Sequence, residues 1–242
     1  MVVVTKVDIL AIGVHPDDIE LSACGSLLQH IQMGKTIGLL DLTKGELGTR
    51  GNATLRSLEA MKASEMMGAE FRYQLDLEDG FFEISKEHIL DIIKIIRACK
   101  PQIVLANAIH DRHPDHGRAS ELISRACFLS GLVKIKTQLD EMEQEAWRPT
   151  QVYHYIQDIY IKPDFVIDIT SYMQNKMDVI KCFASQFYNP ISEEPESPIS
   201  GKDFLDVIQS KARTMGRYIG VEFGEGFTVE RPIKIDDFFT IK

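Results

Sequence analysis

Cysteine is scarce in this 242-residue sequence, and its arrangement excludes two kinds of metal site. The four cysteines stand singly in apolar stretches, and no CxxC pair occurs. This pattern excludes a zinc ribbon and the cysteine-ligated site of nucleoside deaminases. It is typical of buried, reduced thiols in a reducing compartment.

Long apolar runs are also absent. No segment has the roughly 20 consecutive apolar residues that a membrane-spanning helix needs. The N-terminal residues show no apolar region of the kind found in secretory signals. We therefore expect a cytoplasmic protein with no membrane partner.

Positive charge is the third shortage, because 27 Lys and Arg against 36 Asp and Glu give a formal net charge of −9. Nucleic acids and anionic membrane surfaces need a basic face, so neither is an expected partner. An anionic small substrate would need locally placed arginines. The composition, 44% hydrophobic and 26% charged, is ordinary for a globular protein, and the length fits one domain over residues 1–242.

Strand-like and helix-like segments alternate through residues 1–132, which we expect to form the core of this domain. Continuous apolar runs that end at turn residues predict buried strands at 7–14, 36–43, 71–77 and 102–106. Apolar residues at helical spacing predict a helix after each strand, the third with Ser85 as its N-cap. The alternation predicts an α/β protein with a Rossmann-like, mostly parallel sheet flanked by helices.

Residues 150–242 follow a different rhythm, and we expect them to add a small strand and helix region that completes the same domain. Apolar runs at 152–160 and 165–169 predict two more strands that pair antiparallel, and helical spacing predicts helices at 172–184 and 204–219. Residues 189–201 are rich in Pro, Ser and Glu. They predict a solvated surface loop or, alternatively, a mobile lid over a site.

Two short segments carry most of the chemical information: residues 15–18 (HPDD) and 113–116 (HPDH). Each follows a predicted strand, and residues three apart in such a segment can reach one ion from a single turn. Right-handed crossovers can place the first and fourth strands side by side, and ligands bind at the carboxyl ends of parallel strands. We therefore expect the two segments to form one site.

The residue types in these segments suit a catalytic metal ion. Zn²⁺ sites of this kind use three protein ligands and leave one position open, and two histidines with a carboxylate also suit Fe²⁺. We assign the ligands to His15, Asp18 and His116. The sequence does not distinguish the two metals.

The remaining residues of the segments suggest catalytic roles. Asp17 stands next to a ligand and would face the open position, as the general base. His113, as an imidazolium, would stabilise the oxyanion formed during acyl transfer. Asp115 would hold the His113 ring and favour its protonated form.

Each segment also has a simpler interpretation. Taken singly, both are good helix N-termini, where Asp is favoured by capping and by the helix dipole. Among the other histidines, His30, His88 and His154 are expected to be ordinary surface or core residues, and His110 to lie outside the ligand set. A non-catalytic nucleotide-binding protein is disfavoured, because the first strand ends in Gly-Val-His-Pro without a Gly-x-Gly-x-x-Gly motif.

A glycine-punctuated loop at residues 44–52 follows the second strand. Its glycines would let the backbone approach a ligand closely. Arg50 offers a planar fork that suits a carboxylate, and Arg56 and Arg112 are further candidates for substrate binding. Such arginines would let an acidic protein hold an anionic substrate.

Three motifs in order resemble those of the LmbE-like, PIG-L-type N-acetylglucosaminyl deacetylases: residues 14–20 (VHPDDIE), 43–51 (TKGELGTRG) and 112–117 (RHPDHG). The resemblance extends over essentially the whole chain. It implies a Rossmann-like fold and one divalent ion, usually zinc. One departure is Ile19, which separates the two aspartates from Glu20 and makes Glu20 a helix N-terminal or supporting residue.

The resemblance also implies roles for individual residues. It implies metal binding by His15, Asp18 and His116, a general base at Asp17 and oxyanion support at His113. This is the same assignment as the one made above from residue chemistry. It further implies a small-molecule N-acetylglucosaminyl substrate and a homo-oligomer, either a trimer or a hexamer.

Within the family, the chain looks most like the bacillithiol-pathway enzymes, which deacetylate N-acetylglucosaminyl malate. Residues 182–188 (CFASQFY) and 220–227 (GVEFGEGF) carry this part of the resemblance. The expected function is therefore metal-dependent hydrolysis of the substrate acetamide, with release of acetate. The alternative is the same chemistry on a different N-acetyl sugar or small amide.

Overall fold

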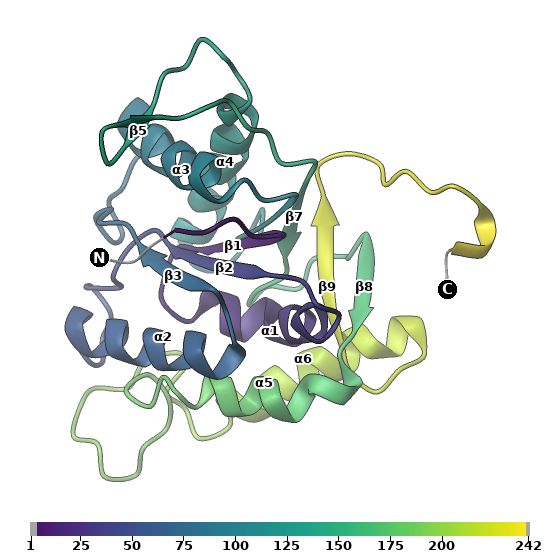
Figure 1. Ribbon diagram of the computed structural model, residues 1–242. Coiled ribbons are helices and arrows are strands. Elements are labelled where there is room, and N and C mark those ends of the chain that lie inside the picture. The colour runs from purple at the N-terminus through teal and green to yellow at the C-terminus, as the bar shows by residue number, and fades with distance from the viewer. Residues whose placement is uncertain (1–3, 241–242) are drawn as a thin grey trace.

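A seven-stranded sheet forms the centre of the molecule, and helices cover both of its faces (Figure 1). The computed structural model describes residues 4–240. The strand order is β3-β2-β1-β4-β7-β9-β8. In chain order the strands are β1 (Ile9–Gly13), β2 (Ile37–Asp41), β3 (Phe71–Gln74), β4 (Ile103–Ala106), β7 (Gln151–Tyr155), β8 (Phe165–Asp168) and β9 (Gly224–Val229).

The strands that precede the two histidine segments are neighbours in the sheet. β1 pairs parallel with β4, so that Ile9 lies opposite Ile103 and Ala11 opposite Leu105. On its other side β1 pairs parallel with β2, and β7 continues the parallel set next to β4. The predicted Rossmann-like, mostly parallel sheet is confirmed. Both histidine segments leave it at the carboxyl ends of its central strands.

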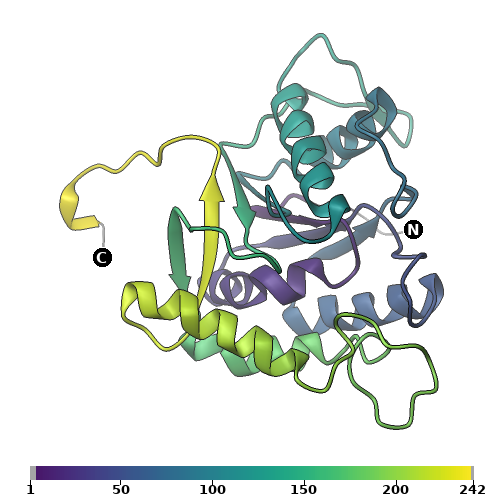
Figure 2. The ribbon, with the colours of Figure 1, turned by 180° about the vertical axis from the view of Figure 1, so that it is seen from behind.

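Two helical layers enclose the sheet, as views from opposite sides show (Figures 1 and 2). One layer holds α1, α2, α5 and α6, and the other holds α3 and α4. The helices are α1 (Asp18–Gln32), α2 (Ala53–Met67), α3 (Lys86–Cys99), α4 (Pro114–Ser130), α5 (Met173–Ile180) and α6 (Phe204–Ile219). Ser85 caps α3 as predicted, because its side chain accepts a hydrogen bond from the His88 backbone N–H.

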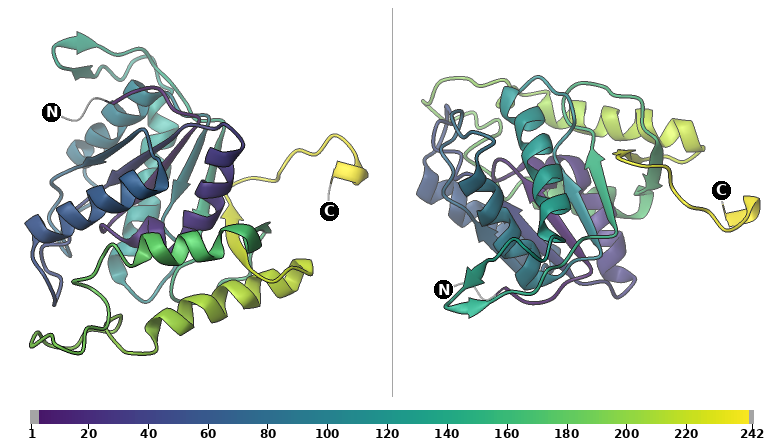
Figure 3. Two further views of the ribbon diagram at one scale, coloured as in Figure 1. Left: turned by 60° about the horizontal axis from the view of Figure 1, so that its bottom comes forward. Right: turned by 90° about the horizontal axis from the view of Figure 1, so that it is seen from above.

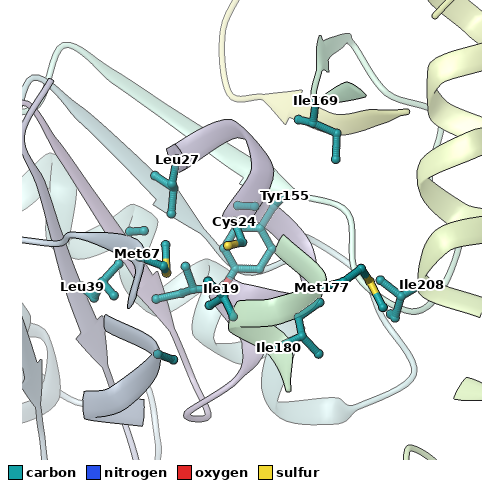
Figure 4. Packing of buried hydrophobic residues seen from close by; sticks show 14 of the residues in the cluster. Ile19, Cys24, Leu27, Leu39, Met67, Tyr155, Ile169, Met177, Ile180 and Ile208 are labelled. Carbon is teal, nitrogen blue, oxygen red and sulfur yellow. The ribbon is translucent and has the colours of Figure 1, made fainter. Parts of the chain in front are cut away.

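β1 supplies side chains to both layers, because alternate residues of a strand point to opposite faces. Ile9 and Ala11 belong to the apolar cluster under α1, α2 and α5, whereas Leu10 and Ile12 belong to the cluster under α3 and α4. Figure 4 shows the first cluster, in which the Tyr155 ring lies among aliphatic and sulfur-containing side chains. Burial on both faces explains why this strand is a continuous apolar run in the sequence.

The C-terminal region differs from the prediction. β7 and β8 do not pair with each other, since β9 lies between them and is antiparallel to both. The strand β9 was missed because Gly224 and Gly226 weaken its strand pattern. A Cβ at Gly226 would lie 2.9 Å from the Met215 sulfur, so this glycine allows α6 to pack closely on β9. Two elements are shorter than expected: β7 ends at Tyr155 and α5 ends at Ile180.

Some short elements lie apart from the central sheet. β5 (Gln138–Leu139) and β6 (Met142–Glu143) form a separate antiparallel hairpin, and η1 (Thr170–Tyr172) leads into α5. After β9 the chain runs away from the body of the molecule to η2 (Phe238–Thr240), as both views in Figure 3 show. Within the described residues, no helix is both long enough and apolar enough to cross a membrane.

Candidate active and metal site

The loops after β1 and β4 bring three histidine rings together. The centroid of the His15 ring lies 4.7 Å from that of His113 and 5.6 Å from that of His116. The His113 and His116 rings are stacked with centroids 5.1 Å apart. The two sequence segments therefore meet at one place, as their position after neighbouring strands predicted.

The first segment turns sharply between β1 and α1. Asp17 has a φ of 143°, a conformation that residues other than glycine rarely adopt. The turn brings the Asp18 carboxylate next to the backbone that precedes it. Its Oδ2 accepts hydrogen bonds from the N–H groups of Val14 and His15, over 3.0 and 2.9 Å. Backbone strain of this kind persists only where surrounding contacts enforce it, and it is common at functional sites.

The second segment forms the start of α4. The helix begins at Pro114, and His113 is its N-cap. The His113 Nδ1 atom accepts a hydrogen bond from the Asp115 backbone N–H over 3.3 Å. This contact leaves the proton of a neutral ring on Nε2. Burial and the neighbouring His15 and His116 rings lower the pKa of His113, which favours a neutral ring over the expected imidazolium.

The Asp18 carboxylate lies between two imidazole nitrogens. Its Oδ1 is 3.1 Å from His116 Nε2, and its Oδ2 is 3.7 Å from His15 Nδ1. The other nitrogen of each ring is hydrogen-bonded to a different carboxylate: His116 Nδ1 to Asp111 over 2.6 Å, and His15 Nε2 to Asp79 over 2.9 Å. If each ring donates to that outer carboxylate, its inner nitrogen presents a lone pair to Asp18.

This arrangement fits a divalent cation. Metal-binding histidines commonly donate their other ring N–H to a carboxylate, as His15 and His116 do here. Without a cation, the contact between His116 Nε2 and Asp18 Oδ1 is satisfied by a proton on the ring. Burial lowers the pKa of His116, but the Asp18 and Asp111 carboxylates have the larger combined effect and raise that pKa to about 10. Two further sets of residues also have donor atoms within 4.8 Å of one another: His15, His113 and His116, and His15, Asp79 and Asp115.

Asp79 and Asp111 were missed by the sequence analysis. Asp79 lies in the turn after β3 and also accepts a hydrogen bond from the Leu47 backbone N–H over 3.0 Å. Asp111 also accepts one from Ile159 N–H, which joins the β4 loop to the β7 loop. Their position after parallel strands was the available signal, but single aspartates in turns are too common to stand out.

Two buried amides fix the Asp18 carboxylate, and these were also missed. Asn107 Nδ2 donates to Asp18 Oδ2, and Gln157 Nε2 donates to Asp18 Oδ1, each over 3.0 Å. Asn107 follows β4, and Gln157 follows β7. With its backbone contacts, Asp18 is thereby held from three neighbouring loops.

Asp17 lies beside these groups with 5% of its surface exposed. Burial raises the pKa of Asp17 to about 6, although the Arg56 guanidinium, whose Nη2 donates to Asp17 Oδ2 over 3.2 Å, opposes that shift. Arg56 also donates to the carbonyl oxygens of Pro16 and Gly45. A buried carboxylate with a raised pKa suits proton transfer near neutral pH.

Gly45 makes room for this arginine. It has a φ of +63°, and a Cβ in its place would lie 2.0 Å from Arg56 Nη1. The sequence analysis attributed the glycines of this loop to close approach by a ligand. At Gly45 the group that approaches is the guanidinium of Arg56.

Arg50 does not have the setting that was predicted for a substrate-binding arginine. Its side chain is buried, Nη1 donates to the Phe187 carbonyl oxygen over 3.0 Å, and Nε lies 3.8 Å from Glu194. Arg50 is absent from the residues that line the cleft described below. The reason is that the loop turns its side chain toward residues 185–194, which it fastens to the body of the protein.

Asp115 also differs from the prediction. Its carboxylate accepts hydrogen bonds from Gly80 N–H over 2.8 Å and from Arg118 over 2.9 Å. No hydrogen bond joins it to the His113 ring among the described residues, and its nearest ring nitrogen is His15 Nε2, at 3.8 Å. The Asp115 carboxylate therefore fastens the turn after β3 to α4, and Asp115 contacts the His113 ring through its backbone N–H alone.

The structure gives the surroundings of Glu20 and of the other four histidines, whose roles the sequence left open or did not require. Glu20 is fully buried and pairs with Arg72, which also binds Asp41 in a bidentate pair. His110 is exposed and lies outside the cleft lining. The buried His154 bonds to the Asn107 carbonyl oxygen, and His88 to that of Glu83. His30 bonds to the Ser26 carbonyl oxygen.

A cleft of about 600 Å³ opens over the site. Its lining includes residues of both histidine segments, Arg56 and Asp79, together with residues of α6 and residues 197–199. Arg112 also lines this cleft, and its contact with a substrate stays a prediction. Residues 189–201, expected to be a surface loop or a lid, thus contribute part of the wall.

Comparison with known proteins identifies relatives over most of the chain. Diacetylchitobiose deacetylase of Thermococcus kodakarensis is 27% identical over 197 residues, 76% of this chain and 72% of that one. The 4-oxalmesaconate hydratase of Pseudomonas putida is 25% identical over 201 residues, 73% of each chain. An uncharacterized deacetylase of Escherichia coli, YaiS, is 33% identical over 125 residues, 49% of this chain and 67% of that one.

A solved structure and a family profile also match this chain. The structure of a conserved protein from Thermus thermophilus superposes with a TM-score of 0.84 at 29% identity, and covers 96% of this chain and 99% of its own. The profile of the PIG-L family, described as GlcNAc-PI de-N-acetylase, matches residues 10–127, which include both histidine segments. The chain belongs to the PIG-L (LmbE-like) family, as its three sequence motifs indicated.

Proposed function

We propose that this protein is a divalent-metal-dependent deacetylase that hydrolyses the acetamide of an N-acetylglucosaminyl compound and releases acetate. The observation that carries the proposal is the convergence of Asp17 with the group formed by His15, Asp18 and His116. The Asp17 carboxylate is buried, with its pKa raised to about 6 by burial, and Asp17 is itself the strained residue in the turn into α1. A general base beside a cation-binding group is the arrangement that metal-assisted hydrolysis needs.

In this proposal His15, Asp18 and His116 hold the ion, which would supply a Lewis acid and lower the pKa of a bound water molecule. Asp17 accepts the proton of the attacking water and then passes it to the departing sugar amine. The Nε2–H group of His113 donates a hydrogen bond to the carbonyl oxygen as negative charge develops on it. Arg56 holds the Asp17 carboxylate in place through the 3.2 Å contact.

Zn²⁺ is the metal that we propose first, with Fe²⁺ as the alternative. Two imidazoles and one carboxylate suit both ions. The outer carboxylates Asp79 and Asp111 would raise the basicity of the His15 and His116 rings toward either ion. Metal analysis of protein purified without added metal, followed by anaerobic reconstitution with each ion, distinguishes them.

For the substrate we propose N-acetylglucosaminyl malate. Its support is the resemblance of residues 182–188 and 220–227 to the bacillithiol-pathway enzymes. Sugar deacetylation in general has a second support, the relative that acts on diacetylchitobiose. The alternative is deacetylation of another N-acetyl sugar or small amide by the same groups. We also propose that the protein is a homo-oligomer, a trimer or hexamer, which sedimentation or light scattering would test.

The decisive experiment measures acetate release and free amine formation together. The wild-type protein, loaded with Zn²⁺ or anaerobically with Fe²⁺, is incubated with N-acetylglucosaminyl malate, diacetylchitobiose and free N-acetylglucosamine. We expect equal amounts of acetate and amine, with the highest kcat/KM for the malate compound. Metal-loaded protein that releases acetate from none of the three would contradict the proposed function.

A hydratase is among the relatives, so one further assay is needed. Hydration of the unsaturated tricarboxylic acid 4-oxalmesaconate can be followed by loss of ultraviolet absorbance. We expect no such loss in the preparation that releases acetate. A preparation that hydrates the acid and releases no acetate would show that the site serves addition of water to a double bond.

A further inference from the structure

We propose that Arg112 and Lys211 form a subsite for an anionic group on the substrate, either a carboxylate or a phosphate. This inference rests on the proposed deacetylase function and deepens it. The sequence suggested that Arg50 binds the anionic aglycone, and we assign this role to Arg112 and Lys211 instead. Neither the family motifs nor the hydrolytic chemistry requires Lys211, which lies in α6, far along the chain from Arg112.

The two cations meet at one carboxylate in the cleft. Arg112 Nε donates to Asp158 Oδ2 over 2.7 Å, and Lys211 Nζ donates to Asp158 Oδ1 over 2.6 Å. Lys211 Nζ also donates to the carbonyl oxygen of Gln157 over 3.3 Å. All three charged side chains line the cleft. The loop before α4, the loop after β7 and α6 therefore converge at this point.

The charges at this point do not balance. Two cations face a single carboxylate, and the cations hold the pKa of Asp158 below its usual value, so it is ionised. The side chains of Arg112 and Lys211 are 46% and 34% exposed. Among the described residues, the terminal guanidinium nitrogens of Arg112 have no hydrogen-bond partner. The cluster therefore keeps a net positive charge and donors that are free to bind an anion.

The other cations of the cleft wall are already neutralised. Arg56 is buried against Asp17. Lys176 pairs with Glu225 over 2.7 Å, and each of these two side chains is 3% exposed. Displacing either partner would leave a buried charge without compensation, which is costly. Of the four Lys and Arg residues that line the cleft, Arg112 and Lys211 are thus the two that can bind a substrate anion without breaking a buried ion pair.

The position of this subsite suits an aglycone. Arg112 directly precedes His113, and Asp158 directly follows Gln157, which binds Asp18. The cleft volume of about 600 Å³ lies within the range of about 300–1,000 Å³ that is typical for drug-sized ligands. There is room for an acetamido sugar at the histidines and for an attached acidic group beside Arg112 and Lys211. Local cations also explain how a protein with a net charge of −9 binds an anion.

The test compares matched substrates that differ in charge. Acetate release is measured with N-acetylglucosaminyl malate, with its neutral dimethyl ester, and with N-acetylglucosamine 1-phosphate. Lys211→Met and Arg112→Gln are compared with wild type, and Arg213→Gln serves as the control. Arg213 lies two residues from Lys211 on α6, pairs with the exposed Glu222, and does not line the cleft.

We expect Lys211→Met to raise the KM for an anionic substrate at least about tenfold more than the KM for the neutral ester, because a charge-assisted hydrogen bond is lost. The anionic compound that shows this selective rise, the malate or the phosphate, identifies the source of the anion. Rising salt should increase the KM of that compound and leave the KM of the ester almost constant. Arg213→Gln should change neither.

Two outcomes overturn the inference. One is an equal effect of Lys211→Met and Arg112→Gln on charged and neutral substrates; the other is an equal selectivity change in Arg213→Gln. If wild-type protein releases acetate from none of the compounds, the proposed function fails, and calorimetry with glucosaminyl malate and methyl glucosaminide tests the subsite directly. Tighter binding of the malate compound that is lost in Lys211→Met would support the subsite, and equal binding of both compounds would overturn it.

Discussion

The Arg56 guanidinium lies 3.2 Å from the Asp17 carboxylate and is held by the carbonyl oxygens of Pro16 and Gly45. The arginine thereby joins the turn after β1 to the loop after β2. It stabilises the charged form of an acid that burial would otherwise protonate. The proposed general base is therefore fixed in position and in charge by one neighbour.

Asp17→Asn should retain the metal and lose most of its turnover. The amide has nearly the same shape but cannot accept a proton, and general-base catalysis typically contributes about 10²- to 10⁴-fold. The measurement is kcat for acetate release alongside metal content by mass spectrometry. Stoichiometric metal with undiminished kcat would remove Asp17 from the role.

The metal ligands can be separated by two further substitutions. Asp18→Asn should lower the metal content sharply, because Asp18 lies between His15 and His116. His113→Gln should keep the metal and lower kcat. The opposite result, metal kept in Asp18→Asn and lost in His113→Gln, would identify three histidines as the ligands, the set that their mutual distances also allow.

Gly45→Ala should lose activity through Arg56. Its Cβ would lie 2.0 Å from Arg56 Nη1, so the guanidinium must move away from Asp17. Gly34→Ala is a matched control, since Gly34 also has a positive φ, of +80°, and an added Cβ there meets no atom within 4 Å. Both variants should lose about 1 kcal/mol of stability through the strained backbone. Kinetic assays should find the large loss in kcat only in Gly45→Ala, and equal losses would contradict this explanation.

Arg72→Met should destabilise the fold strongly. Arg72 neutralises the buried carboxylates of Glu20 and Asp41, and removing one partner from a buried ion pair typically costs about 3–5 kcal/mol. Arg125→Met is the comparison, because it breaks an exposed pair with Glu121 that should contribute about 1 kcal/mol or less. Denaturant unfolding followed by circular dichroism measures both, and similar midpoints would show that the Arg72 network contributes little.

The thiols should be unreactive in the folded protein. All four cysteines are buried, and burial raises the pKa of Cys99 to about 12. At pH 8 a thiol reagent should label none of them quickly, since the thiolate is the reactive form. Denaturant should expose all four. Rapid labelling under native conditions would show local opening around the labelled residue.

Sequence reasoning succeeded where a single strand or turn carries the information. The apolar runs predicted the first four strands, and their order along the chain predicted that the segments at His15 and His113 meet. It also placed Asp17 and Asp18 beside these histidines, whereas the roles assigned to the two aspartates stay predictions.

It failed where the role depends on a distant partner. Asp79, Asp111 and Gln157 are ordinary loop residues until the fold brings them to His15, His116 and Asp18. The setting of Arg50 was not foreseen for the same reason, because the sequence does not show which way a loop turns its side chain. Gly224 and Gly226 hid β9, since close packing of α6 requires the residues that disfavour a strand.

The place of β9 in the sheet affects when the site can form. Glu225 of this strand accepts hydrogen bonds from the backbone N–H groups of Gly25 and Ser26 in α1 and pairs with Lys176 of α5. During synthesis β9 is made after every other strand of the sheet. The histidine segments therefore leave the ribosome before the strand that supports α1 and α5, so a nascent chain carries the ligands before this part of the cleft lining has formed.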